Sequence, residues 1–336
     1  MAVNEDLASA LDLFTTPTVK REENTHFQGI TDKNKADLLK IFVDFYGEKH
    51  RKYIADTLET VKFIFPSQMS EEDMKNFDVD DRMKNAFVND LKDFKISSSD
   101  AQAYCTGYLD KNGNFQKCIV LSDKFNDHQL IHEFNHVLEM RFVEKDENGL
   151  TFFTGFNNIE ERFDNQSTNE DETELNEVVN EAITGKILEI KNELGVEISQ
   201  FPDESAGYLW GEKISRKFVE HFLPDLAECR ITGQPDKFKE LIGKDNFNKI
   251  SEDLKTIMGY DFFKLSSIRD EIEQKTGRKL ENSSDFVTRS EDFANLDLDE
   301  EHKNLFETIS DYKSRSNDII EHDEGLRRRQ DDRTIR

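Results

Sequence analysis

The chain is poor in cysteine, with only Cys105, Cys118 and Cys229. Their odd number and spacing match neither a zinc knuckle nor a redox pair, so reduced thiols in a reducing compartment are expected. No apolar run approaches the length that spans a bilayer, and the first residues lack a basic segment followed by an apolar core. We therefore expect a cytoplasmic protein without a membrane anchor, unless a leader was removed or export follows a non-classical route.

Proline and glycine are also scarce, with 5 and 15 residues among 336. Because these residues interrupt helices, their scarcity favours long helices with few tight turns. Only 35% of the residues are hydrophobic, but 27 phenylalanines supply large apolar side chains for a core. The composition predicts a mostly helical, folded protein.

Basic residues are outnumbered 45 to 71 by acidic ones, which gives a net charge of −26. This balance disfavours nucleic acid as a general partner and equally disfavours an anionic membrane surface. It is compatible with attraction of cations or basic polypeptides. The sequence also lacks a phosphate-binding loop, a dinucleotide-binding glycine pattern and a serine nucleophile elbow.

Apolar spacing predicts helices over residues 33–64, and an N-cap with an acidic first turn predicts another helix reaching about residue 94. Residues 103–123 alternate around Asn112-Gly113, the strongest short-range signal for a β-hairpin. This is the only β segment predicted. With Asn112-Gly113 as the central turn pair, Cys105 lies diagonal to Cys118 on one face, which disfavours a disulfide. The fold class is therefore mainly α with a small β-hairpin or sheet (α+β).

Residues 172–194 form a strongly amphipathic helix, and further helices are expected from about 208 to 275. The predicted organisation is an N-terminal helical region over 1–95, a central domain over 96–280 and a polar tail over 281–336. The tail ends in RRRQDDRTIR, which is short and flanked by acids. It is interpreted as a solvated, disordered tail rather than a nucleic-acid patch.

One stretch carries chemistry: NDHQLIHEFNHVLEM, residues 126–140, contains the pattern H-E-x-x-H. On a helix, His132 and His136 lie about 40° apart around the axis and about 6 Å along it. Two imidazoles so placed can bind one tetrahedral Zn²⁺, and Glu133 is placed to take a proton from the attacking water. The alternative is an amphipathic helix with two structural histidines.

Two neighbours of this pattern are excluded from the same first coordination shell. Glu139 lies seven residues from His132, about 10 Å along the axis, which is too far for one ion. The same argument separates His128 from His136. Glu139 is then either a hydrogen-bond acceptor behind the ligands or a solvated charge.

A third ligand is expected from another helix, and LNEVVNEAIT at 175–184 offers two carboxylates. HEFNH followed by NEAIT resembles the thermolysin-like zincins of the gluzincin clan. The resemblance implies a zincin-like architecture with Glu181 as the third zinc ligand. Glu177, one turn earlier and also preceded by Asn, stays open as a ligand or a supporting residue. The arrangement of an edge hairpin before the HExxH helix also resembles a gluzincin. Such an edge can bind an extended peptide by strand addition.

The resemblance departs from the pattern in two ways. No Asp follows NEAIT, since Gly185 and Lys186 stand there, so the residues that orient the ligands must differ. Gluzincins also use a Tyr or His to stabilise the oxyanion, and neither lies between His136 and Glu181. Tyr208 is the expected donor, with His221 and Tyr260 as further options; Tyr208 could equally be a packing residue.

The resemblance implies a zinc metallopeptidase that hydrolyses polypeptide substrates, with Glu133 and Tyr208 as catalytic residues. Zinc would be bound by His132, His136 and Glu181. Two other hypotheses stay open: a zincin-like regulatory or interaction protein without turnover, and a helical protein without metal. Substrate specificity and oligomeric state are not predicted.

Overall fold

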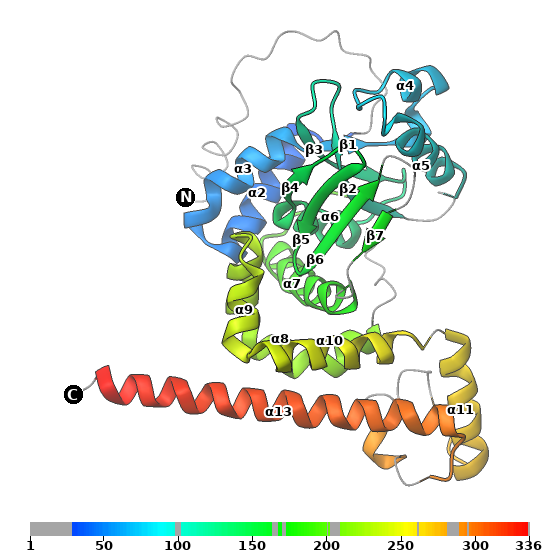
Figure 1. Ribbon diagram of the computed structural model, residues 1–336, viewed down its shortest axis with the longest axis vertical. Helices are drawn as coiled ribbons and strands as arrows, with labels where there is room; N and C mark the ends of the chain where they lie inside the picture. The colour runs from blue at the N-terminus through cyan, green and yellow to red at the C-terminus, as the bar shows by residue number, and fades with distance from the viewer. Residues whose placement is uncertain are drawn as a thin grey trace. The chain divides into compact units, whose positions relative to one another are not determined.

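The computed structural model describes residues 29–97, 102–162, 167–169, 173–199, 201, 209–260, 262–280, 289–293 and 296–334. The chain divides into two compact units, and helix α7 (Thr173–Glu193) contributes to both (Figure 1). Unit 1 comprises residues 1–169 and 183–205, and unit 2 comprises residues 170–182 and 206–336. The domain boundaries predicted at residues 95 and 280 stay predictions. None of the described helices has both the length and the apolar character required to cross a bilayer.

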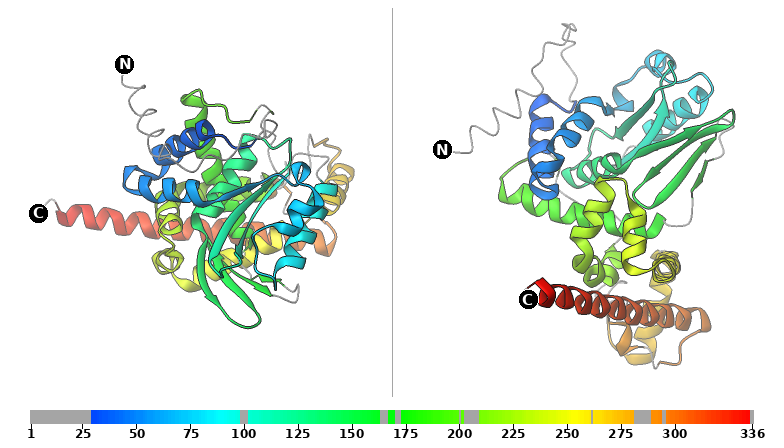
Figure 2. Two further views of the ribbon diagram at one scale, coloured as in Figure 1. Left: turned by 90° about the horizontal axis from the view of Figure 1, so that it is seen from above. Right: turned by 60° about the vertical axis from the view of Figure 1, so that its left-hand side comes forward.

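Unit 1 combines helices with two small sheets, which agrees with the α+β prediction. Its helical elements are α2 (Asp32–Tyr46), η1 (Glu48–His50), α3 (Arg51–Thr60), η2 (Pro66–Gln68), α4 (Glu71–Asn76), α5 (Lys84–Ser97) and α6 (Asp127–Glu139), followed by the second half of α7. Helices α2 and α3 lie at one side of the strands, and α4 and α5 lie at the other (Figure 2).

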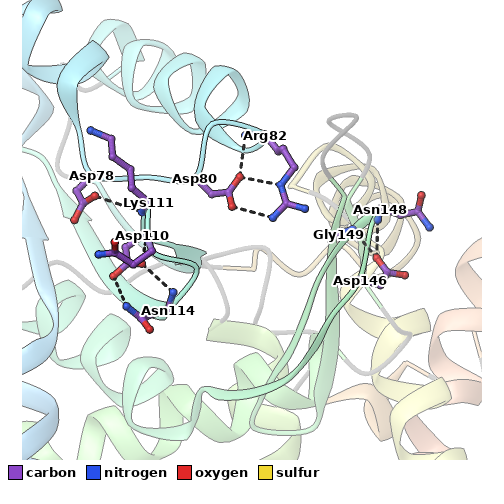
Figure 3. A network of polar contacts seen from close by, with 10 residues as sticks. Asp78, Asp80, Arg82, Asp110, Lys111, Asn114, Asp146, Asn148 and Gly149 are labelled. Atoms are coloured by element: carbon purple, nitrogen blue, oxygen red, sulfur yellow. Dashed lines mark hydrogen bonds and ion pairs between the residues drawn. The ribbon is translucent and has the colours of Figure 1, made fainter.

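The first sheet has three strands in the order β1-β3-β2. Strands β2 (Ala103–Leu109) and β3 (Phe115–Leu121) form the predicted hairpin, and β1 (Lys62–Ile64) pairs with β3 in parallel. The Asp110 carboxylate accepts hydrogen bonds from the backbone N–H of Asn112 (2.9 Å) and Asn114 (2.8 Å), so it shapes the loop (Figure 3). Gly113 permits the turn with a φ of +78°.

The hairpin register differs by one position from the prediction. Cys105 lies opposite Ile119, and Cys118 lies opposite Thr106. Because side chains alternate between faces, the two cysteines point to opposite faces rather than lying diagonally on one face. All three cysteines are free, as expected, although the reason is this alternation.

A second, four-stranded sheet was not predicted from the sequence. Its antiparallel strands run in the order β4 (Arg141–Lys145), β5 (Gly149–Thr154), β6 (Asn157–Arg162) and β7 (Ser167–Asn169). Edge strand β4 is exposed along most of its length and has a register shift between Phe142 and Glu144, so it shows no alternation. In its loop to β5, Asp146 accepts from the backbone N–H of Asn148 and Gly149 (Figure 3).

Two helical predictions for the N-terminal region are correct in type but too long. Residues 33–64 form α2 and α3, separated at Gly47, where φ is +93°, and the last three residues form β1. Helix α4 has the expected cap, because Ser70 accepts from the Asp73 N–H. It ends at Asn76, where a turn with the Asp80–Arg82 ion pair precedes α5 (Figure 3). Arg82 lowers the pKa of Asp80 to about 2.

One hydrophobic core joins these elements of unit 1. It brings together apolar residues of α5 and both sheets, among them Leu91, Tyr108, Val120 and Phe152, each no more than 2% exposed. Full burial of such side chains stabilises by roughly 1.5–3 kcal/mol each. Helix α6 packs against strands β2, β3 and β5 and against α3. The predicted HExxH helix is therefore held inside the unit.

Unit 2 is built from helices in its described part. They are the first half of α7, α8 (Leu209–Ile231), α9 (Pro235–Ile242), α10 (Lys244–Met258), α11 (Phe262–Thr276), η3 (Ser290–Asp292) and α13 (Glu300–Thr334). In the first half of α7, Asn176 Oδ1 accepts a 3.1 Å hydrogen bond from the guanidinium of Arg230 in α8, and both side chains are buried.

Helix α13 replaces most of the expected polar tail. Most of its apolar residues, including Leu305, Ile309, Tyr312 and Ile319, are buried, and the helix packs against α8 and α10 (Figure 1). These residues recur at helical spacing, but the many charges between them hid the pattern. The helix continues to Thr334, so the basic stretch at the C-terminus is largely helical rather than a disordered tail.

Candidate metal centre

Helix α6 begins at a well-formed cap. Asn126 is the N-cap residue: its side chain accepts from the Gln129 N–H, and the Gln129 side chain accepts from the Asn126 N–H. The sequence analysis gave the capping role to Asp127, which is instead the first helical residue and is buried. This shift by one residue leaves the predicted positions of the histidines on the helix unchanged.

The burial of α6 separates the HExxH residues into two kinds. Of the thirteen residues of the helix, only Gln129 and Glu133 are not buried. His132 and His136 are 8% and 5% exposed. The imidazoles are thus removed from bulk water, whereas Glu133 remains partly exposed. Two buried imidazoles can serve as metal ligands, and a partly exposed carboxyl can exchange a proton with a water molecule.

The two imidazoles of the motif point at each other. His132 Nε2 and His136 Nε2 lie 3.2 Å apart, with ring planes inclined at 74°. Two nitrogens that are each about 2.0–2.1 Å from one tetrahedral zinc ion are about 3.3 Å apart. A hydrogen bond between the rings has a similar length. The other possible metal ligands nearby therefore decide how this spacing is interpreted.

Helix α7 carries those possible metal ligands. It is one unbroken helix from Thr173 to Glu193, and its second half belongs to unit 1. The buried Lys191 Nζ in that second half lies 2.7 Å from Asp127 of α6. The same Asp127 carboxylate accepts from the backbone N–H of Ile198 and Ser199, which follow α7. These contacts tie α7 to the start of α6.

Two His/Glu groups that could bind a metal ion occur here. His132, His136 and Glu177 each offer a ligand atom within 4.8 Å of one another, and so do His128, His132 and Glu181. All are buried except Glu177, which is partly buried. The HExxH pair is therefore grouped with Glu177, the alternative in the sequence analysis. The predicted Glu181 is grouped with His132 but not with His136.

His128 and Glu139 can now be placed. Among the described residues, no such group contains both His128 and His136, in agreement with the helix-geometry argument. His128 nevertheless joins His132 and Glu181, a grouping that the sequence analysis did not consider. Glu139 is 0% exposed, so its interpretation as a solvated charge is wrong. It is a buried carboxyl whose charge contributes to raising the pKa of Tyr53.

The C-terminal end of α6 is covered by donors from distant elements. His136 O accepts from Thr154 Oγ1 (3.1 Å), Val137 O accepts from Lys117 Nζ (2.9 Å), and Leu138 O accepts from Tyr53 Oη (2.5 Å). Arg141 also donates to Leu138 O and to the Tyr53 hydroxyl. These donors satisfy carbonyls that a helix end leaves open, and the cations complement its dipole.

Burial shifts the pKa values of two side chains at the C-terminal end of α6. It raises the pKa of Tyr53. It also lowers the pKa of Lys117 to about 7, and the nearby Arg141 charge adds to this shift. Lys117 therefore titrates near physiological pH, and it can donate to the Val137 carbonyl in either protonation state.

A tyrosine of α2 reaches the motif itself. Tyr46 donates a hydrogen bond from its hydroxyl to Asn135 Oδ1, and both side chains are buried. The neighbouring Phe42 packs edge-to-face on Phe134 at 4.9 Å. Sequence reasoning did not find Tyr46, Tyr53 or Lys117, because each comes from an element distant in the chain and belongs to no motif.

The three residues proposed as oxyanion donors lie in different surroundings or outside the described part of the chain. Tyr208 lies outside the described residues. His221 and Tyr260 belong to unit 2, where His221 Nε2 lies 2.8 Å from Asp323 and the Tyr260 hydroxyl donates to Glu301 O at 2.8 Å. Neither contact points to an oxyanion, so the donor stays a prediction.

The comparisons with known proteins add no relative. No family model, no curated protein and no solved structure matches this chain. The assignment of a function therefore depends on the motif and on the geometry of helices α6 and α7.

Proposed function

We propose that this protein is a zinc-dependent metallopeptidase of the gluzincin type. The observation that carries the proposal is the pair of buried imidazoles of α6, whose Nε2 atoms face each other at 3.2 Å. Their spacing fits a tetrahedral zinc, and a carboxyl of α7 completes a His₂Glu donor set. Such a set leaves one coordination position open, which a catalytic zinc requires.

His132, His136 and one α7 carboxyl would hold the ion. The resemblance favours Glu181, whereas the grouping with both histidines favours Glu177. The two residues are one helical turn apart, so a side-chain rearrangement can exchange their roles. The carboxyl that is not a ligand would accept a hydrogen bond from a histidine and orient it.

Glu133 would move the proton. When bound, zinc supplies a Lewis acid that polarises the peptide carbonyl and brings the pKa of its water towards 7. Of the three acidic residues of α6, Asp127 and Glu139 are buried, whereas Glu133 remains partly exposed. Its carboxylate would accept the proton of the attacking water and then donate it to the leaving amine.

The substrate would be an extended polypeptide. Strand β2 is at an edge of the order β1-β3-β2 and packs against α6. An extended peptide can add to such an edge through main-chain hydrogen bonds. The net charge of −26 favours the approach of basic segments. Tyr208 is proposed to stabilise the oxyanion, and loss of turnover with retained zinc in Tyr208→Phe would support that role.

The decisive experiment measures zinc and cleavage in the same preparations. The full chain is loaded with zinc, desalted and analysed for metal, and then incubated with a broad peptide library. We expect about one zinc per chain, cleavage by the wild type, and no bound zinc in His132→Ala. Glu133→Gln should keep the zinc and lose roughly 10²–10⁴-fold in rate, the usual contribution of a positioned acid–base group.

A matched control is Glu147→Gln, which makes the same change at an exposed position in the β4–β5 loop. It should retain both zinc and cleavage. Zinc content far below one per chain would rule out the metal centre. Zinc without Glu133-dependent cleavage would instead indicate a zincin-like binding protein.

A further inference from the structure

A groove in unit 2 is unrelated to the candidate metal centre. It forms a surface cavity of about 400 Å³ between helix α13 and helices α8, α9 and α10. Its apolar lining consists of Phe222, Leu241, Ile242 and Ile319. Three of these side chains are buried, but Leu241 at the rim is 41% exposed. The groove therefore offers an apolar floor with a partly exposed leucine at its rim.

The α13 wall of the groove is acidic. Asp311 and Asp318 line it and are exposed. Seven residues separate them, which places them about 10 Å apart on one face of the helix. Within the described part of unit 2, neither makes an ion pair. Two uncompensated carboxylates thus flank an apolar floor.

The cations near this wall are already engaged. Arg315 Nε lies 3.3 Å from Asp253, and Arg327 pairs with Asp323 at 2.6 Å and with Asp225 at 2.8 Å. Burial raises the pKa of Asp253, and the charge of Asp311 adds to that effect. The lining of the groove holds three carboxylates, Asp311, Asp318 and Asp323, and one guanidinium, Arg315, which already pairs with Asp253, so negative charge is in excess.

We propose that this groove binds a short basic segment of a partner polypeptide. Two lysine or arginine side chains would meet Asp311 and Asp318, and an aliphatic side chain between them would lie on Leu241 and Ile319. Basic residues three positions apart in a polyproline II segment lie on one face about 9 Å apart, close to the spacing of the two aspartates. The chain's overall negative charge would steer such a segment towards the protein.

The proposal is tested by fluorescence polarisation on the full chain with a labelled peptide, GKALKG. We expect saturable binding that weakens as NaCl is raised from 50 to 500 mM. Replacing both lysines of the peptide by glutamate should abolish binding, and replacing its leucine by serine should weaken binding several-fold. The double variant Asp311→Asn/Asp318→Asn should weaken binding at least tenfold.

The matched control is Glu300→Gln/Glu321→Gln, which removes two exposed charges from α13 outside the groove. It should change the affinity less than twofold. Equal losses in the two double variants, or no binding of the peptide, would overturn the proposal. Spermidine that binds as tightly as the peptide and displaces it would assign the groove to a polyamine and also overturn it.

Discussion

Lys191 Nζ lies 2.7 Å from the Asp127 carboxylate, and both side chains are almost completely buried. The pair joins the first turn of α6 to the second half of α7. Asp127 also receives the backbone N–H groups of Ile198 and Ser199 at 3.2 and 2.5 Å. One carboxylate therefore sets the relation between the helix that carries the HExxH motif and the helix that carries Glu177 and Glu181.

Asp127→Ala should destabilise the protein by about 3–5 kcal/mol, because it leaves the Lys191 ammonium buried without its counter-charge. Urea unfolding followed by circular dichroism measures the loss. The matched control is Asp56→Ala, which removes an exposed ion pair with Lys52. That change should cost less than about 1 kcal/mol. Similar losses at both positions would show that the buried pair has no special role.

Alanine variants of the two α7 carboxyls distinguish the possible zinc ligands. Because Glu177 is grouped with both HExxH histidines, we expect Glu177→Ala to abolish tight zinc binding. Glu181→Ala should lower zinc affinity about 10- to 100-fold, as loss of a supporting residue does. Competition with a chromogenic zinc chelator gives both affinities. The reverse order would assign the ligand to Glu181, as the resemblance implies.

Lys117 should make stability depend on pH in a defined window. Its pKa is about 7 in the folded protein and about 10.4 in an unfolded chain, so the unfolded state binds more protons between these values. The free energy of unfolding should therefore rise with pH from 7 towards 10, by on the order of 2–4 kcal/mol after solvent screening. Urea midpoints at pH 7 and 9.5 measure the change.

The comparison variant for this pH effect is Lys117→Met, which has no titrating amine at the end of α6. Its stability should rise less between pH 7 and 9.5 than that of the wild type. Lys145→Met, at an exposed position of β4, should follow the wild type. Parallel curves for wild type and Lys117→Met would mean that Lys117 titrates normally.

Asn126→Ala should destabilise α6 by about 0.5–2 kcal/mol, because the Gln129 N–H loses its capping acceptor. We expect the upper end of this range, since Asn126 is only 2% exposed and water cannot replace the lost acceptor. Asn126→Asp retains the acceptor and should cost less. Thermal unfolding of the three proteins, compared with the exposed cap variant Ser70→Ala, gives the ranking.

Local patterns determined how much of the fold could be predicted. The apolar stripe of residues 172–194 predicted α7 to within one residue at each end, and Asn112-Gly113 predicted the β2–β3 hairpin. Strand β4 could not be predicted, because most of its side chains are exposed and it shows no alternation. Helix α13 was missed because its charges, such as Asp311 and Arg315, outnumber the apolar residues that it buries.

The candidate site could likewise be predicted only where a local pattern determines it. His132, Glu133 and His136 could be found because helical spacing fixes their relation within five residues. The choice between Glu177 and Glu181 depends on the rotation of one helix against another, which no local pattern encodes. The contacts of Tyr46 with Asn135 and of Lys117 with Val137 depend on tertiary packing across many residues of sequence.

The division of α7 between the two units has a consequence for synthesis of the chain. Unit 1 includes residues 183–205, so its strands and α6 emerge from the ribosome before the segment that completes the unit. Residues 170–182, which belong to unit 2, must be made in between. The Asp127–Lys191 ion pair can therefore form only after Lys191 has been synthesised. A single cut after residue 205 would release unit 1 only together with residues 170–182, which belong to unit 2.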